Sequence, residues 1–185
     1  MRSVVWLVLV VGACGVSSSI RAAESTSAQD RAVLDGALRL AGRHLYGHLP
    51  LELASELPPR LSLGAEAWTV FDEKGRGTRA FVYTNSRTFR CASVPGRDQA
   101  RCQLKLASVI VHEAWHLQHG RDEGGAYDAQ LIFLQLTEAW ATFQLNQAAA
   151  INLNMVRRAK ARALSSYDRH RFRADVSGPN AAIPG

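Results

Sequence analysis

The sequence predicts a single domain of the α+β class, and three observations support this prediction. The chain has 185 residues, a length typical of one domain with its own hydrophobic core. Hydrophobic residues make up 47% and charged residues 21%, which excludes an intrinsically disordered chain. Its apolar patterns follow the order helix, β-hairpin, helix and long helical segment, without an internal repeat, and this order is typical of α+β domains.

The beginning of the chain is typical of an export signal. A basic residue precedes the apolar run of residues 4–11 (VVWLVLVV), which is too short to cross a bilayer because a spanning helix needs roughly 20 apolar residues. We therefore expect residues 1–23 to be a signal peptide. As an alternative, the sequence VGAC resembles the lipobox of bacterial lipoproteins, in which Cys14 would be lipidated and would anchor the protein to a membrane. Both interpretations predict an exported protein, either periplasmic or secreted.

Export also explains the odd number of cysteines. With Cys14 in the signal region, Cys91 and Cys102 remain as a pair in an oxidising compartment. The polar, turn-like residues 92–101 between them make closure easy, and a disulfide across so short a loop contributes about 3 kcal/mol on the chain-entropy estimate. Two separate buried thiols are the alternative. A cysteine-based zinc site is disfavoured because the chain has no second cysteine pair.

The first half of the body, which we place at residues 24–176, contains a predicted helix and a predicted hairpin. Residues 32–46 carry a helical stripe of apolar side chains. The prolines at positions 50, 58 and 59 bound an irregular connector. Residues 67–71 and 80–84 are aromatic and β-branched, and the turn-rich sequence EKGRG separates them. This pattern predicts a β-hairpin or small sheet.

The second half is predicted to be helical. Residues 104–119 form a helix that ends at Gly120, a residue common after helices. Residues 121–125 (RDEGG) are expected to be a loop or a frayed helix start, because paired glycines resist helix formation. One long apolar helix is expected from residue 126 to about 164, followed by a basic helical segment. Residues 177–185 are expected to be a flexible tail.

The motif that predicts chemistry is HEAWH at residues 112–116. On a helix, His112 and His116 lie one above the other, about 6 Å apart along the axis, so both imidazoles can bind one metal ion. Zn²⁺ is the usual occupant of such a site. Glu113 lies about 100° around the helix and can take a proton from a zinc-bound water. The alternative is a surface helix with two solvated histidines.

HEAWH resembles the active-site helix of the zincin metallopeptidases, and the detailed resemblance covers about residues 104–131. It implies that this helix supplies two zinc ligands and the general base, beneath a sheet whose edge strand pairs with an extended substrate. In the gluzincin group the third ligand is a glutamate on the following helix, often trailed by small residues. Glu123 resembles that layout, although it lies only seven residues after His116. Gln118 departs from the family pattern, which prefers an apolar residue there.

The third metal ligand must come from beyond Gly120. His119 lies about 10.5 Å along the helix axis from His112, too far to share one zinc ion with it. The resemblance favours Glu123, while the metzincin spacing matches Asp122 and the longer gluzincin spacing matches Glu138. Each acid could instead be solvated or cap a helix. The candidates in order of preference are Glu123, Asp122, Asp128 and Glu138.

Two further side chains of this segment have candidate roles. Asp128 could orient a ligand histidine through its second ring nitrogen, since such partners are usual around metal sites. Tyr127 could donate a hydrogen bond to a developing oxyanion and so take part in catalysis. The alternative for Tyr127 is an aromatic side chain packed in the core.

The sequence therefore predicts an exported zinc-dependent hydrolase, most similar to peptidases, with one Zn²⁺ per chain and a peptide or protein substrate. One alternative is a zinc-binding but non-catalytic envelope protein that serves binding or assembly, and another is a lipid-anchored structural protein in which HEAWH is coincidental.

The net charge of +6 divides into +2 for residues 1–23, −1 for residues 24–156 and +5 for residues 157–185. No nucleic-acid partner is expected, because no nucleic-acid motif accompanies the basic end. A solvated helix face explains these basic residues, and contact with acidic envelope polymers or lipid head groups is the alternative.

Overall fold

The computed structural model describes residues 27–45, 49–59, 61–62, 64–140 and 142–176. The predictions for the signal peptide, for lipidation of Cys14 and for the tail at 177–185 fall outside these residues. The α+β class is confirmed by a small sheet together with helices. The helices are α1 (Ala28–Ala41), the short 3-10 helix η1 (Gly42–His44), α2 (Arg87–Ser93), α3 (Gln99–His119), α4 (Glu123–Trp140) and α5 (Phe143–Val176). Within the described part, no helix is long and apolar enough to cross a bilayer.

The sheet has three strands in the order β1-β3-β2. The predicted hairpin is confirmed, because β2 (Ala67–Phe71) pairs antiparallel with β3 (Gly77–Tyr83). The irregular connector predicted before it was wrong in part, since residues Leu51–Ala54 form β1, which pairs parallel with β3. Four residues are too few for a periodic signal. β1 forms because its backbone pairs with β3, which lies further along the chain, so the local sequence carries no sign of it.

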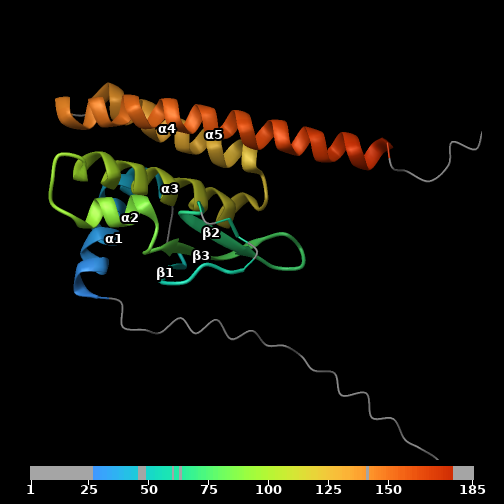
Figure 1. Ribbon diagram of the computed structural model, residues 1–185, viewed down its shortest axis with the longest axis horizontal. Coiled ribbons are helices and arrows are strands. Elements are labelled where there is room, and N and C mark those ends of the chain that lie inside the picture. Colours follow the sequence, from blue (N-terminus) through green and yellow to red (C-terminus); the bar gives the residue numbers. More distant parts are fainter. Residues whose placement is uncertain (1–26, 46–48, 60, 63, 141, 177–185) are drawn as a thin grey trace, which may run out of the picture.

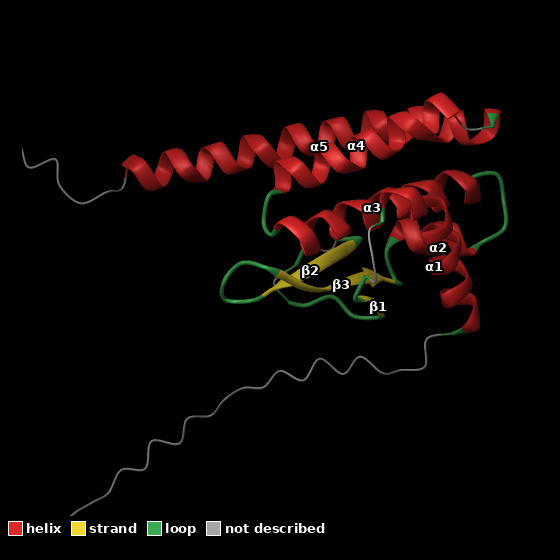
Figure 2. Cartoon of the chain, turned by 180° about the vertical axis from the view of Figure 1, so that it is seen from behind, coloured by secondary structure: helices red, strands yellow, loops and turns green. Residues whose placement is uncertain are grey.

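α3 is the central element of the fold. Figure 1 shows α4 and α5 running side by side along one side of α3, with the sheet on the other side, and the view from behind in Figure 2 shows the same layers. The side chains of Leu104, Leu106 and Ile110 on α3 are completely buried, as are Phe133 and Leu134 on α4 to within a few per cent. This burial on several sides holds the HEAWH helix in a fixed position.

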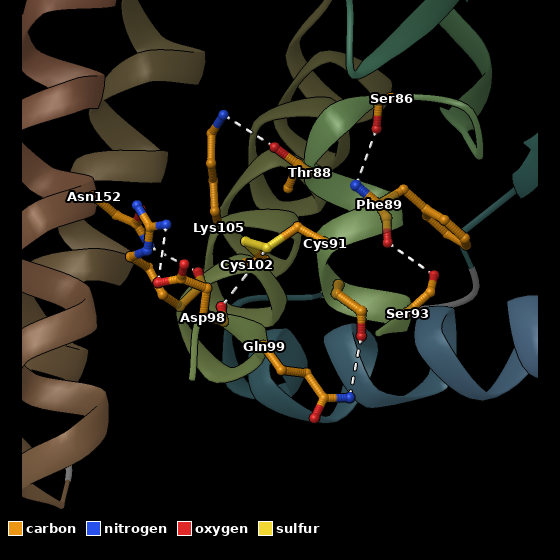
Figure 3. The surroundings of a disulfide bond; sticks show 12 residues. Ser86, Thr88, Phe89, Cys91, Ser93, Asp98, Gln99, Cys102, Lys105 and Asn152 are labelled. Atoms are coloured by element: carbon orange, nitrogen blue, oxygen red, sulfur yellow. Dashed lines mark hydrogen bonds and ion pairs between the residues drawn. A yellow bond between two sulfur atoms is a disulfide. The ribbon is translucent and has the colours of Figure 1, made fainter. Parts of the chain in front are cut away.

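The disulfide between Cys91 and Cys102 is present and joins α2 to the beginning of α3 (Figure 3). The turn-like segment predicted between the cysteines is shorter than expected. α2 extends to Ser93 and α3 begins at Gln99, before the predicted start at residue 104. The apolar stripe alone missed these polar helical turns, which pack against neighbouring elements.

The single long helix predicted from residue 126 was wrong. The chain forms two antiparallel helices instead, with α4 ending at Trp140 and α5 beginning at Phe143. Two contacts show their register: Lys160 forms an ion pair with Asp128, and the Asn146 side chain donates to the backbone carbonyl of Glu138. The apolar pattern continues through the interruption, so periodicity alone could not locate it.

Candidate metal centre

The two histidines of HEAWH and the first residue of α4 meet at one point. His112 and His116 project from α3 toward α4, and Glu123 returns from the beginning of α4. The chain reverses at Gly120, whose φ of 78° is a conformation that favours glycine. Nε2 of His112 lies 3.5 Å from one carboxylate oxygen of Glu123, and Nε2 of His116 lies 3.4 Å from the other.

The spacing of these donor atoms fits one tetrahedral metal ion. The two Nε2 atoms are 3.2 Å apart, and each lies within 3.5 Å of one of the two Glu123 carboxylate oxygens. A tetrahedral zinc ion with bonds of about 2.0–2.1 Å separates its ligand atoms by about 3.4 Å. Two imidazoles and one carboxylate are also a donor set that catalytic zinc sites use. The residues present therefore fit a metal ion in number, type and spacing.

Each histidine is held by its surroundings. His116 donates from Nδ1 to the carbonyl oxygen of Gly120 over 2.7 Å, so its Nε2 keeps the lone pair that a metal requires. The His112 ring packs edge-on against Tyr127, with centroids 4.7 Å apart. Burial opposes a charge on His116, but the hydrogen bond with Glu123 and the Gly120 carbonyl together raise its pKa above the usual value. The same histidines lower the pKa of Glu123.

Glu113 lies beside this cluster and faces the sheet. Its side chain is 7% exposed, and its carboxylate accepts a 2.7 Å hydrogen bond from the hydroxyl of Thr69 on β2. Burial raises the pKa of Glu113, against the lowering effects of His112 and of the Thr69 hydroxyl. A carboxylate with a raised pKa, close to the metal donors, is suited to accept and return protons.

The other predicted acids do not reach the histidines. Asp122 caps α4, since its carboxylate accepts a 3.1 Å hydrogen bond from the backbone N–H of Gly125. The Asp128 carboxylate binds Lys160, and Glu138 lies near the far end of α4. Among the described residues, the cluster of candidate ligands contains Glu123 alone of the four acids.

Tyr127 is half-buried beside His112, and burial raises the pKa of its phenol. The predicted role of Tyr127 as a hydrogen-bond donor stays a prediction. His119 stacks on Trp115 with ring centroids 4.0 Å apart, one turn beyond the cluster.

Three supporting features were missed by sequence reasoning. Thr69 lies 44 residues from Glu113 and had no recognisable signal. The Gly120 carbonyl is a backbone group, which no residue type reveals. Gly125 is different, because a β-carbon there would lie 2.6 Å from the Trp115 ring, so only glycine lets α4 approach α3 this closely. The Gly124-Gly125 pair is the signal in the sequence for this close approach, and both glycines lie within α4.

Comparisons with known proteins identified no relative of this chain. The chain matches no family model and has no significant match among curated proteins or solved structures. The resemblance to zincins therefore depends on the HEAWH helix and the residues around it.

Proposed function

We propose that this protein is an exported zinc-dependent hydrolase of the peptidase type. Zn²⁺ would be held by His112, His116 and Glu123, and Glu113 would act as the general base. The observation that carries this proposal is the convergence of three side chains: the two Nε2 atoms lie 3.2 Å apart, each is within 3.5 Å of a Glu123 carboxylate oxygen, and the buried Glu113 carboxylate lies beside them. A surface helix with two solvated histidines would not require this burial and convergence.

Each residue around the cluster has a separate role in the proposed hydrolysis. When bound, the zinc ion supplies a Lewis acid and lowers the pKa of a water molecule toward about 7. Glu113 accepts a proton from the attacking water and returns it to the leaving amine, and Thr69 holds the carboxylate in place for both transfers. Tyr127 orients His112 by ring packing and is in addition proposed as a donor to the oxyanion.

The position of β2 supports an extended peptide as substrate. Within the described part of the chain β2 pairs on one side with β3, so its other edge is available to a strand-like ligand. The strand also carries Thr69, which touches Glu113. A peptide paired along this edge would therefore pass close to the proposed base, as the resemblance to zincins implies.

The disulfide supports export as part of the proposal. Structural disulfides persist in oxidising compartments and are rare in the cytosol. We place the protein in the periplasm or outside the cell, with membrane attachment through Cys14 as the alternative to signal cleavage.

The test measures metal and turnover separately. Elemental analysis of the purified protein should find one zinc per chain, and the protein should cleave peptides from a mixed library. Glu113→Gln should retain zinc and lose cleavage, while Glu52→Gln on β1 serves as the matched control and should retain both. Absence of stoichiometric zinc would refute the proposal. Zinc binding with no cleavage would instead indicate the non-catalytic envelope protein.

A further inference from the structure

A cleft of about 540 Å³ lies beside the metal centre. One wall is the turn between β2 and β3, and the other is the last turn of α3. These two segments touch closely, because a β-carbon on Gly77 would lie 2.5 Å from the His116 carbonyl oxygen. Lys74 and Gly77 belong to the first wall, and Gln118 and Gly120 to the second.

Arg121 follows Gly120 and contacts the Phe71 ring, which in turn packs against His116 of the metal centre. The guanidinium of Arg121 lies 5.1 Å from the centroid of the Phe71 ring. The Phe71 and His116 rings pack in a T-shaped arrangement, with centroids 5.7 Å apart. Stacking on an aromatic face orients a guanidinium and leaves its N–H groups free to donate in the plane. Arg121 is thus a cation held over a ring that itself packs against a proposed metal ligand.

Three acids of this region, Asp72, Asp122 and Glu123, are already engaged. The Asp72 carboxylate accepts hydrogen bonds from the Arg76 side chain and from two backbone N–H groups. Asp122 caps α4, and Glu123 belongs to the metal cluster. Within the described ranges, neither Arg121 nor Lys74 has a carboxylate partner within ion-pair distance. Arg121 and Lys74 are therefore cations without an ion-pair partner among the described residues, Lys74 in the wall of the cleft and Arg121 directly after it.

We propose that Arg121 binds a carboxylate of the substrate, so that the protein acts on peptides with an acidic group close to the bond at the metal. This inference deepens the proposed hydrolytic function and rests on it. A guanidinium fork binds a carboxylate through two parallel hydrogen bonds, which fixes orientation as well as contributing to affinity. The carboxylate can belong to an aspartate or glutamate side chain or to the C-terminus of the peptide.

The experiment measures peptide binding by isothermal titration calorimetry to the zinc-loaded Glu113→Gln variant, which should leave peptides intact. Three octapeptides of alanine and glycine are compared: one with a central glutamate and an amidated C-terminus, its glutamine counterpart, and the glutamine peptide with a free C-terminus. We expect one carboxylate-bearing peptide to bind about tenfold more tightly than the amidated glutamine peptide. Which of the two binds more tightly identifies the source of the carboxylate.

Replacement of the arginine tests its role. Arg121→Ala should reduce the preference to less than about twofold, and Arg121→Glu should reverse it in favour of a lysine peptide. The matched control is Arg79→Ala, because Arg79 is stacked on Phe81 at 5.7 Å on another part of the sheet, and it should retain the preference.

Three results would overturn the inference: equal binding of all three peptides, binding of none, or a preference that survives Arg121→Ala. Zinc content is measured on the same samples. A wild type without zinc would refute the proposed function, whereas full zinc content without a carboxylate preference would refute this inference alone.

Discussion

Thr69 on β2 donates a 2.7 Å hydrogen bond to the Glu113 carboxylate on α3, so the sheet directly holds the proposed general base. The same hydroxyl also lies 3.4 Å from the Glu113 backbone carbonyl. Glu113 is almost fully buried, and a buried carboxylate without a hydrogen-bond donor is costly. The contact therefore affects both stability and catalysis.

Thr69→Val should separate the base from its donor while preserving shape. We expect a loss of about 1–2 kcal/mol in the free energy of unfolding, measured by urea denaturation, and a roughly tenfold lower turnover with unchanged zinc content. Thr69→Ser should restore both. Thr84→Val is the control, since the Thr84 hydroxyl donates to the Ala54 carbonyl and not to the Glu113 carboxylate. Unchanged stability and turnover in Thr69→Val would show that the hydroxyl has no such role.

Gly125→Ala should weaken metal binding although Gly125 is not a ligand. The new β-carbon would collide with Trp115, displace the first turn of α4 and move Glu123 away from the histidines. Zinc affinity, measured by competition with a chromophoric chelator, should fall by about 10–100-fold.

The neighbouring glycine offers a matched control for this displacement. The nearest atom to a β-carbon on Gly124 is an Asp122 carboxylate oxygen at 3.3 Å, on a side chain that can move. Gly124→Ala should keep zinc affinity and raise helix stability by up to about 1 kcal/mol. Equal zinc affinity in the two variants would contradict the close-packing argument.

Glu123→Gln tests the third ligand. The amide is a poor zinc ligand, so the variant should lose its zinc on dialysis, as measured by elemental analysis. Asp128→Asn removes an acid from the same helix and breaks only the ion pair with Lys160, so it should keep zinc. Zinc loss confined to Asp122→Asn or Glu138→Gln would move the third ligand to one of those residues.

In the metal-free protein, the pKa of His116 should lie above the ordinary imidazole value of about 6.5. Because this pKa is raised by folding, the pair with Glu123 stabilises the metal-free fold below that pH, and the stabilisation is lost as the pH rises through the raised value. The lowered pKa of Glu123 has the opposite sign, so its contribution is lost as the pH falls below its unfolded value of 4.5. The pair therefore stabilises the metal-free protein most between about pH 4.5 and 6.5.

Zinc reverses this dependence, because it binds only the neutral imidazole. We expect zinc affinity to fall as the pH is lowered. Because the pKa of His116 is raised, this fall should begin above about pH 6.5, at a higher pH than for an ordinary histidine. Histidine NMR titration of the metal-free protein measures the pKa, and Glu123→Gln should lower it. A His116 midpoint at or below the ordinary value would contradict the pairing.

The parts of the fold that could be predicted have local causes. The apolar stripe of α3 and the β-branched hairpin at β2 and β3 are visible in the sequence, and the structure contains both. β1 and the interruption between α4 and α5 depend on contacts between distant segments, so periodicity did not reveal them. The disulfide was predictable because only two cysteines remain in the body of the chain.

The candidate site divides in the same way. His112, Glu113 and His116 could be identified from their spacing on a helix, and Glu123 from its resemblance to a ligand on the next helix. Thr69 could not be identified, because its contact with Glu113 depends on where the sheet packs. Arg121 could not be identified either, since its position over Phe71 depends on how the β2–β3 hairpin packs against the end of α3.

The three donor side chains lie within the span of residues 112–123, and this short span has a consequence for folding order. Closing so small a loop costs little conformational entropy, so α3 and α4 can hold a metal ion early. Alignment of Glu113 requires a strand 44 residues away and must come later. Under the proposed function, a folding chain would bind zinc before Glu113 is in place to activate water, so a partly folded population would have little hydrolytic activity.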